Sequence, residues 1–508
     1  MYPYFFETIG GIADYQSGEE WTVPDLKREV FARIAYYQKK GISSQDKVII
    51  VHGNNARFFA DLFALWHLNA CGVCVDVNIG STEFENITEC CKSQFAICLD
   101  GIPEKLTDIN CKHISFIDTL TVPTAEEFSK KTTRIPFPLN MDDPAIILFT
   151  SGTTGMPKGV VHTFRTLMAK WIILSENVPL EHMDVSLCLL PTNFGHGLIC
   201  NCLFPLLSGK KLVVLPKFNL TVLAKLGNII DEFSVTYMSS VPSVWKSALS
   251  ISRPPEKGSL RLVTCGSAPL SADLWQKMQT WTGTKRIWNT YGITETGSWI
   301  AGTSVDEVEP KDGLIGPGWG TRILVSKNQE MADVKVDKLL EKNSLPVGEV
   351  GYVWLQTPTL MQGYLNRPDL TQSVVCGTWF YTGDLGYINE DGLLVLSGRV
   401  RNEINYGGIK VIPEDVDLIL ERHETIAESC TFGLADEMAG QMVAVAVVLK
   451  DDLEKPLTSE LKQWSSQYLS DYKVPTVWYE VDAIPKTSRG KVNREDVAAF
   501  CQDRSKMK

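Results

Sequence analysis

The 508-residue sequence has no excess of positive charge, no long apolar run and no basic leader. Lys and Arg number 49 against 60 Asp and Glu, which gives a formal net charge of -11 and argues against nucleic acid as the main partner. The longest uncharged apolar run, at 442–449, is too short to span a bilayer. The N-terminus lacks the basic start and apolar stretch of a secretory signal. We therefore expect a cytoplasmic protein with no membrane span and no nucleic-acid partner.

Paired cysteine motifs are scarce as well, although the chain contains 13 cysteines. Their odd number and apolar surroundings favour reduced core thiols over a disulfide framework. Cys71 and Cys74 have the spacing of a redox or zinc pair, but they lie in a β-branched apolar run. Neither a second pair nor histidines follow at zinc-finger spacing. We expect both to be buried strand residues.

Apolar β-branched runs alternate with helical patterns over the first 300 residues, which predicts parallel sheets covered by helices on both faces. Short strands with Gly and Asp-Gly turns at 340–400 predict a small antiparallel sheet. The chain is also longer than one hydrophobic core usually serves. We predict an α/β protein. Its large N-terminal domain (1–399) would hold two parallel-type α/β subdomains plus a small β subdomain, followed by a small, mobile α+β C-terminal domain (402–508).

The Walker A string G-x-x-x-x-G-K-[ST] is absent, but residues 148–163, LFTSGTTGMPKGVVHT, form a glycine-rich segment between a predicted strand and a predicted helix. The carboxyl end of a parallel strand is where open α/β sheets bind ligands. Glycines there let backbone N–H groups approach oxyanions, while the hydroxyls and Lys158 add donors and a mobile charge. From these residues alone, both a phosphate cradle and a polar surface loop remain open.

This segment is the first of seven motifs that, in order, resemble those of the adenylate-forming superfamily. That superfamily comprises acyl- and aryl-CoA synthetases, nonribosomal peptide adenylation domains and beetle luciferases. The resemblance covers nearly the whole chain and implies ATP-dependent, AMP-forming activation of a carboxylic acid. The motifs are TSGTTGMPKG (150–159), GSAPLS (266–271), YGITETG (291–297), GEVGYV (348–353), YTGDLGY (381–387), GRVRNEINYGGIKVIPEDVD (398–417) and PKTSRGKVNR (485–494).

The resemblance implies a nucleotide site. In it, Tyr291 lies against adenine, Asp384 accepts hydrogen bonds from both ribose hydroxyls, and Arg399 supports Asp384. Without the motifs, Tyr291 would be interpreted as a core residue and Asp384 as part of a turn. The implied ATP-binding residues are Thr150, Ser151, Gly152, Thr153, Thr154, Gly155, Lys158, Gly266, Ser267, Ala268, Tyr291, Gly292, Asp384 and Arg399.

Attack of a carboxylate on the α-phosphorus of ATP brings two anions together, so catalysis has to come from cations and hydrogen-bond donors. Glu295 resembles the family's magnesium-binding glutamate, and Lys491 the lysine that touches the carboxylate and the α-phosphate. Thr294 completes the implied catalytic set. As isolated residues, Glu295 and Lys491 would be solvated surface charges. Arg401 stands at the family's hinge position, where Asp or Lys is usual, so rotation of the C-terminal domain is expected to pivot there.

The acid is expected to bind near residues 189–212. Adenylation domains for α-amino acids place an aspartate in this region, and counting back from LLSGK puts His196 at that position. An α-amino acid is therefore not expected, because its amine would be buried without a counter-charge. His196 is interpreted either as a hydrogen-bond partner of a substrate hydroxyl or distal carboxylate, or as a satisfied pocket histidine. Gly292 stands where acetate-activating members carry a pocket-closing Trp, so a two-carbon acid is not favoured.

The rest of the pocket wall follows from the same alignment and predicts a medium, mostly apolar pocket. The predicted pocket residues are Asn193, Phe194, His196, Cys200, Ser239, Val263, Cys265, Thr290, Ser298 and Trp299.

The expected function is ATP- and Mg²⁺-dependent activation of a non-α-amino carboxylic acid, aryl or medium acyl, followed by transfer to a thiol, with CoA as the first choice. The alternative is a freestanding adenylation enzyme that loads the phosphopantetheine of an acyl or peptidyl carrier protein in trans. A catalytically silent nucleotide-binding protein is a third hypothesis, which the intact Glu295, Asp384 and Lys491 argue against. Luciferase-like oxygenation has no motif of its own here.

Overall fold

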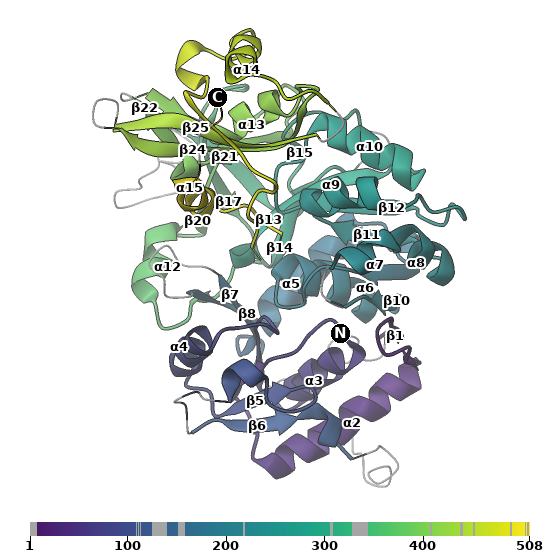
Figure 1. Ribbon diagram of the computed structural model, residues 1–508. Helices are drawn as coiled ribbons and strands as arrows, with labels where there is room; N and C mark the ends of the chain where they lie inside the picture. Colours follow the sequence, from purple (N-terminus) through teal and green to yellow (C-terminus); the bar gives the residue numbers. More distant parts are fainter. Residues whose placement is uncertain are drawn as a thin grey trace.

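The computed structural model is shown in Figure 1. It describes residues 8–107, 109, 111, 113–123, 140–150, 158–216, 219–304, 308–327, 344–406, 409–436, 440–450, 453–487, 490–502, 504 and 507. At 401, 410 and 440 it describes the backbone alone.

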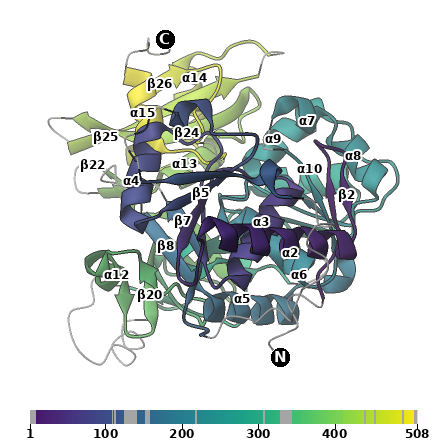
Figure 2. The same ribbon diagram turned by 90° about the horizontal axis from the view of Figure 1, so that it is seen from below.

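The first sheet belongs to the N-terminal part of the chain and is mainly parallel. Helices α2 (Val23–Lys40) and α3 (Ala56–His67) lie on one side of it and α4 (Ser81–Cys91) on the other (Figure 2). Asn55 caps α3 by accepting a hydrogen bond from the Phe58 N–H. The strands, in spatial order, are β18 (Gly363–Tyr364), β8 (Lys158–Thr163), β7 (Pro144–Thr150), β4 (Cys71–Cys74), β3 (Lys47–Ile50), β5 (Phe95–Cys98) and β6 (Ser115–Asp118).

The second sheet is parallel except at its two edges, where β2 and β14 run antiparallel to their neighbours. One of its faces is covered by α7 (Leu220–Ala224), α8 (Leu226–Phe233), α9 (Pro242–Ile251) and α10 (Ala272–Thr282). The strands, in spatial order, are β14 (Ser298–Gly302), β13 (Ile287–Ile293), β12 (Leu262–Gly266), β11 (Tyr237–Ser240), β9 (Val185–Cys188), β10 (Lys211–Val214), β1 (Ile12–Asp14) and β2 (Glu20–Trp21).

An extensive hydrophobic core fills the space between these two sheets. It contains inward-facing side chains of both, such as Ile50 and Leu148 from the first and Leu212 and Leu262 from the second. Helix α5 (Phe164–Asn177), the π-helix η5 (His196–Leu203) and α6 (Phe204–Leu207) pack in this layer. The strand ends and η5 are thereby held on a rigid base, which positions the loops above them.

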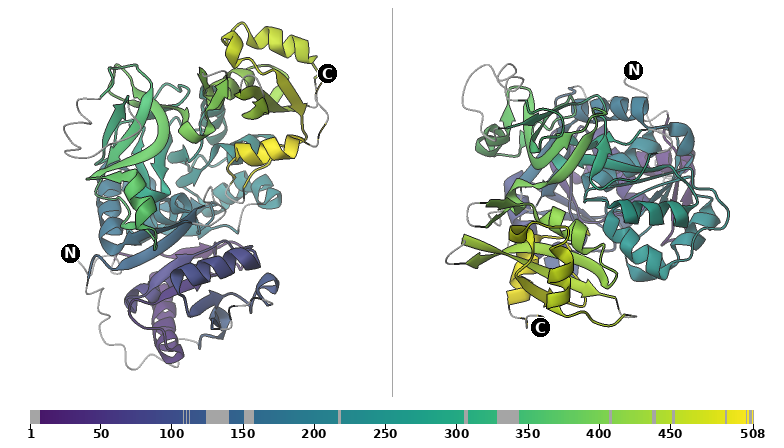
Figure 3. Two further views of the ribbon diagram at one scale, coloured as in Figure 1. Left: turned by 90° about the vertical axis from the view of Figure 1, so that its left-hand side faces the viewer. Right: turned by 90° about the horizontal axis from the view of Figure 1, so that it is seen from above.

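Two smaller sheets complete the fold and lie at the end of the molecule away from α2 and α3 (Figures 1 and 3). The third sheet is antiparallel and contains β15 (Leu314–Gly316), β21 (Leu394–Arg399), β20 (Trp379–Ile388), β17 (Gly351–Gln356), β16 (Arg322–Ser326) and β19 (Val375–Cys376), with α12 (Pro368–Val374) beside it. The fourth contains β23 (Ile409–Val411), β22 (Ile404–Tyr406), β25 (Gly440–Leu449), β24 (Ile426–Asp436) and β26 (Val477–Glu480), and packs with α13 (Pro413–Leu420), α14 (Thr458–Ser465) and α15 (Arg494–Gln502).

The predicted fold class is confirmed, because two parallel-type α/β units, a small antiparallel sheet and a mixed C-terminal unit follow in that order. Cys71 and Cys74 are buried in β4, as expected, and all 13 cysteines are free. One element differs from the prediction. The second half of the glycine-rich segment forms β8, which pairs antiparallel with β7 instead of leading directly into the helix. None of the described helices is long and apolar enough to cross a membrane.

Candidate active site

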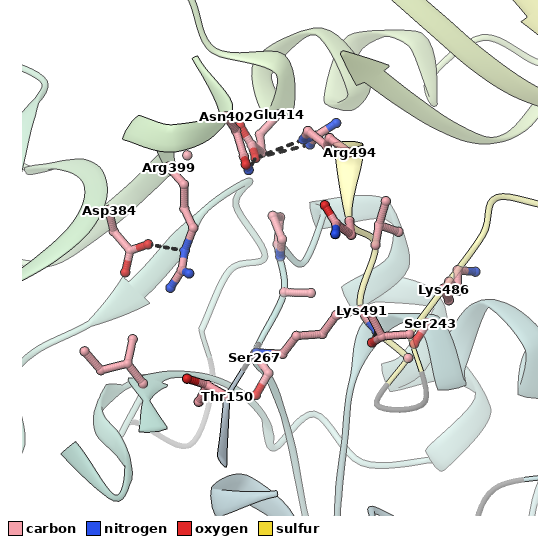
Figure 4. Close-up of a pocket in the computed structure, with 18 of the residues that line it drawn as sticks. Thr150, Ser243, Ser267, Asp384, Arg399, Asn402, Glu414, Lys486, Lys491 and Arg494 are labelled. Atoms are coloured by element: carbon pink, nitrogen blue, oxygen red, sulfur yellow. Dashed lines mark hydrogen bonds and ion pairs between the residues drawn. The ribbon is translucent and has the colours of Figure 1, made fainter. Parts of the chain in front are cut away.

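A cleft of about 1410 Å³ opens where the carboxyl ends of the second sheet meet the third sheet and the C-terminal residues. The predicted motifs converge on it. Thr150, Ser267, Glu295 and Asp384 all line the cleft together with Lys491, which comes from the last sixth of the chain. Figure 4 shows Lys491 extending from its loop toward Ser267.

Asp384 forms one corner of the cleft with Tyr291 and Arg399. The Tyr291 hydroxyl donates to Asp384 Oδ2 at 2.5 Å, and Arg399 Nε lies 2.5 Å from Asp384 Oδ1. Strands β20 and β21 set this geometry, since Asp384 and Arg399 are direct cross-strand partners. The negative charge of Asp384 raises the pKa of Arg399, and burial together with Asp384 raises the pKa of Tyr291. Tyr291 therefore acts as a neutral donor to a fixed carboxylate at the cleft wall.

Glu295 lies on the short helix η6 (Thr294–Thr296), between β13 and β14. Its Oε1 accepts a hydrogen bond of 2.7 Å from the Tyr364 hydroxyl, and the Lys158 ammonium lies 5.7 Å from the centre of the Tyr364 ring. Burial, together with Glu295, raises the pKa of Tyr364. A hard cation at Glu295 would find a carboxylate oxygen there. Among the described residues no group of three His, Cys, Asp or Glu side chains forms a metal cluster.

Three buried side chains contact the backbone carbonyls of the segment that carries Glu295. His162 Nε2 lies 2.8 Å from the Thr294 carbonyl oxygen, Cys200 Sγ donates to the Gly297 carbonyl at 3.6 Å, and the Lys170 ammonium donates to the carbonyls of Ser298 and Trp299.

Burial shifts the pKa of two of these supporting groups. Burial lowers the pKa of His162 to about 4 and that of Lys170 to about 8. Neither residue, nor Tyr364, was predicted from the sequence, because all three lie outside the residues that the motifs assigned to the site.

The backbone of Lys491 is hydrogen-bonded to Thr487. The Thr487 N–H donates to the Lys491 carbonyl, the Lys491 N–H donates to Thr487 Oγ1 at 3.2 Å, and Gly490 adopts a φ of +72° that glycine tolerates best. The Lys491 ammonium lies 5.1 Å from the centre of the Phe194 ring, a cation–π distance. It is also close enough to His196 to lower the pKa of that imidazole. The C-terminal lysine is thus positioned beside the predicted acid pocket.

Ion pairs hold the C-terminal elements against the rest of the chain. Lys246 of α9 lies 2.8 Å from Glu421, and Arg422 lies 2.5 Å from Asp312. Lys486, within the Lys491 loop segment, lies 2.9 Å from Glu428. The first two pairs join the C-terminal elements to the rest of the chain, and the third lies within the C-terminal elements.

His196 begins η5 and is buried, with both ring nitrogens engaged. Nδ1 lies 2.9 Å from Ser267 Oγ and Nε2 2.6 Å from Ser239 Oγ. Burial, with a smaller effect of Lys491, lowers its pKa to about 3, so the imidazole is neutral at physiological pH. Its ring centre lies 5.8 Å from that of Phe194 and 5.3 Å from that of Trp299.

The other predicted pocket residues divide into two groups. Asn193, Phe194, Thr290 and Ser298 line the cleft with His196. Cys200, Ser239 and Trp299 are fully buried and are not among the residues that line the cleft.

Val263 and Cys265 need a correction. They pack with Trp245 on the opposite face of the second sheet, because side chains alternate along β12 and it is Thr264 that contacts Ser239.

Of the other residues predicted to bind ATP, the structure describes Gly266, Ala268 and Gly292. Gly266 ends β12 and Ala268 lines the cleft. A Cβ at Gly292 would lie 2.2 Å from the Ser298 backbone, so β14 leaves no room for a side chain there. Ser151, Gly152, Thr153, Thr154, Gly155 and the side chain of Arg401 lie outside the described part of the chain.

Comparisons with known proteins show the family of the chain. A family model described as AMP-binding enzyme matches residues 9–365, and one described as AMP-binding enzyme C-terminal domain matches 415–491. The 4-coumarate–CoA ligase-like 4 of Oryza sativa subsp. japonica is 31% identical over 387 residues, covering 75% of this chain and 68% of that relative. The 4-coumarate–CoA ligase 1 of Petroselinum crispum is 27% identical, over 98% and 93% of the two chains.

Among solved structures, ATP-bound MatB from Rhodopseudomonas palustris has a TM-score of 0.86 at 21% identity and covers 99% of both chains. It shares the fold, including the C-terminal unit. Together with the family match over most of the chain, this shows that the protein belongs to the AMP-binding enzyme family, the adenylate-forming superfamily that the motifs indicated, and is an AMP-forming acid–thiol ligase.

Proposed function

We propose that the protein activates an aryl or medium acyl carboxylic acid, not an α-amino acid, with ATP and Mg²⁺, and then transfers the acyl group to CoA. A carboxylate oxygen attacks the α-phosphorus, the bond to the β-phosphate oxygen breaks and pyrophosphate leaves. In the second step a thiol sulfur attacks the acyl carbonyl carbon, AMP leaves and the thiol proton passes to solvent. The supporting relatives are named CoA ligases.

The Lys491 ammonium is the cation that joins the two anions. Placed beside Phe194 and His196, it can donate to the acid carboxylate and to an α-phosphate oxygen as negative charge develops there. It is a compact point charge with three donors, so it can serve two acceptors at once. This position of Lys491 is the single observation that carries the proposal.

The nucleotide is proposed to lie between Tyr291, Asp384 and the Ser267 turn. The fixed carboxylate of Asp384 has lone pairs left to accept ribose hydroxyls after binding Tyr291 and Arg399. Thr150 and Lys158 flank the phosphate side at the ends of β7 and β8. When bound at Glu295, Mg²⁺ would neutralise phosphate charge, and Tyr364 would orient that carboxylate by its hydrogen bond.

We further propose that 1–399 and 402–508 are separate domains and that Arg401 is the pivot between them. Short connecting segments often absorb such rotations, and the ion pairs of Lys246 and Arg422 are few enough to exchange. The thirteen free thiols favour a reducing compartment, and we place the reaction in the cytoplasm.

The test is pyrophosphate release across a panel of aryl, medium acyl and α-amino acids, repeated with CoA and with a phosphopantetheinylated carrier protein as acceptor. We expect release with aryl or acyl acids and thioester formation with CoA. The proposal would be contradicted if only α-amino acids led to pyrophosphate release, or if none of the acids in the panel did. Thioester formed on the carrier but not on CoA would support the carrier-loading alternative.

A further inference from the structure

Glu414 of α13 joins segments that are far apart in the sequence. Its Oε1 accepts a hydrogen bond of 2.7 Å from the Asn402 side-chain amide, and the Arg494 guanidinium contacts the same oxygen, with Nη2 at 3.2 Å and Nε at 3.3 Å. The Glu414 side chain is only 8% exposed, so salt screens these contacts little. Figure 4 shows the three side chains together at the cleft, with Lys491 below them.

The position of Glu414 also places it at the proposed hinge. Asn402 directly follows Arg401, the proposed pivot, and Gly398 precedes it at the end of β21. A Cβ at Gly398 would lie 2.7 Å from Glu414 Oε2, so the missing side chain leaves the room that the carboxylate occupies. Glu414 therefore contacts the chain on both sides of the pivot.

Arg494 extends these contacts to the segment that presents Lys491. It is the first residue of α15 and comes shortly after Lys491 in the sequence. Its Nη1 donates to Asp417 Oδ2 and to the Thr431 carbonyl, each at 2.7 Å, while its other nitrogens face Glu414. Through Glu414, the helix that begins beside Lys491 is thus joined to the residue that follows the hinge.

We propose that Glu414 is a positioning residue that couples the hinge to the segment presenting Lys491. Its contacts with Asn402 and Arg494 fix the Lys491 ammonium relative to the pivot, so that rotation of the C-terminal unit delivers the cation to one place. Both partners follow the pivot in the sequence and turn with Glu414, whereas Gly398 precedes it. Of these three contacts, the one with Gly398 is the one that rotation breaks. The inference rests on the proposed acid activation and the proposed hinge.

The first test compares the two half-reactions in Glu414→Ala. Acyl-adenylate formation is followed as pyrophosphate release with 4-coumarate or hexanoate, whichever the wild type uses faster. Thioester formation is followed by mixing the preformed adenylate of that acid with CoA.

We expect acyl-adenylate formation in Glu414→Ala to slow roughly tenfold or more, because small errors of position are costly for a group that acts in the transition state. The loss should lie in kcat and not in the KM for acid or ATP. Thioester formation should stay within about twofold of the wild type, since that step does not need the Lys491 ammonium at the phosphate. Equal loss in both half-reactions would assign Glu414 a merely structural role and overturn the inference.

Two further variants test the contacts themselves. Glu414→Gln keeps the side-chain length and an oxygen that accepts from Asn402, so it should lose less than Glu414→Ala. Asn402→Ala removes the hinge contact and should slow acyl-adenylate formation about 3- to 10-fold. Because Asn402 acts through Glu414, the variant with both alanines should be no slower than Glu414→Ala alone. Losses that multiply in the double variant would show that the two residues act independently and would overturn the coupling.

Asp415→Ala is the matched control, because it removes the neighbouring carboxylate of α13. Asp415 pairs with Lys473 at 3.3 Å and is not among the residues that line the cleft, so both half-reactions should keep their wild-type rates. Thermal unfolding shows whether each variant folds. If Glu414→Ala does not, Asn402→Ala decides, and equal loss of both half-reactions there overturns the inference. If the wild type releases pyrophosphate with no acid of the panel, the proposed function itself fails.

Discussion

The Lys491 ammonium lies over the ring of Phe194, 5.1 Å from its centre. The two residues are almost 300 positions apart in the sequence, and the contact joins the C-terminal loop to the wall of the acid pocket. The structure therefore places this cation next to the predicted acid pocket, as the proposed first half-reaction requires.

Lys491→Ala should abolish acyl-adenylate formation and spare thioester formation from a preformed acyl-adenylate. The ammonium is needed where two anions meet, and a drop of about 100-fold or more in pyrophosphate release is expected. Lys473→Ala, which removes another C-terminal lysine paired with Asp415, serves as the control. Equal loss of both half-reactions in Lys491→Ala would contradict the assignment.

Tyr291→Phe and Asp384→Asn should weaken ATP binding to different extents. Removing the tyrosine hydroxyl deletes one hydrogen bond to Asp384, so the KM for ATP should rise about 3- to 10-fold. Asp384→Asn should have the larger effect, because Arg399 then loses its counter-ion. Steady-state kinetics with ATP and acid varied separately would measure this, and a rise confined to the KM for the acid would refute the nucleotide assignment.

The ion pair between Lys246 and Glu421 should favour the placement of the C-terminal unit seen here. Lys246→Glu should slow acyl-adenylate formation roughly 3- to 10-fold, and Glu421→Lys in the same chain should restore part of the rate. The exposed pair of Lys277 and Asp273 within α10 offers a matched control. If the double variant is no faster than Lys246→Glu alone, the pair does not act through mutual attraction.

His162 should make the fold sensitive to acid. Burial lowers its pKa from 6.5 to about 4, so between these values the unfolded chain binds a proton that the folded chain does not. Stability is therefore lost as the pH falls from 6.5 toward 4, by at most about 1.4 kcal/mol per pH unit for one group. We expect His162→Gln to show a smaller drop in melting temperature between pH 7 and pH 5 than the wild type. His113→Gln, at an exposed position, should retain the wild-type drop, and an unchanged drop in His162→Gln would disprove the effect.

Local patterns sufficed for most strands and helices, because apolar β-branched runs are easily told from helical patterns along the chain. They failed for β8 and η5. In β8, residues 159–163 are all buried, so no alternation distinguishes a strand from the rest of the glycine-rich segment. The π-helix η5 is buried along its whole length and gives no amphipathic period either.

The sequence also predicted only some of the site residues. The motifs singled out Asp384, Glu295 and Lys491, and all three line one cleft. Counting residues from a motif could not show which face of β12 points to the pocket. Side chains alternate along a strand, so an error of one residue selects Val263 and Cys265 instead of Thr264. Tyr364 and Lys170 act through tertiary contacts with Glu295 and the Ser298 carbonyl, which no local pattern reveals.

Lys170 has one further consequence. Its ammonium contacts the peptide carbonyls of Ser298 and Trp299, and in the described part of the chain no carboxylate pairs with it. With a pKa of about 8 it is mostly protonated at neutral pH, so a positive charge remains uncompensated in a medium of low dielectric constant beneath the cleft floor. A chain with a formal net charge of -11 thereby contains a buried local source of positive potential next to the segment that carries Glu295.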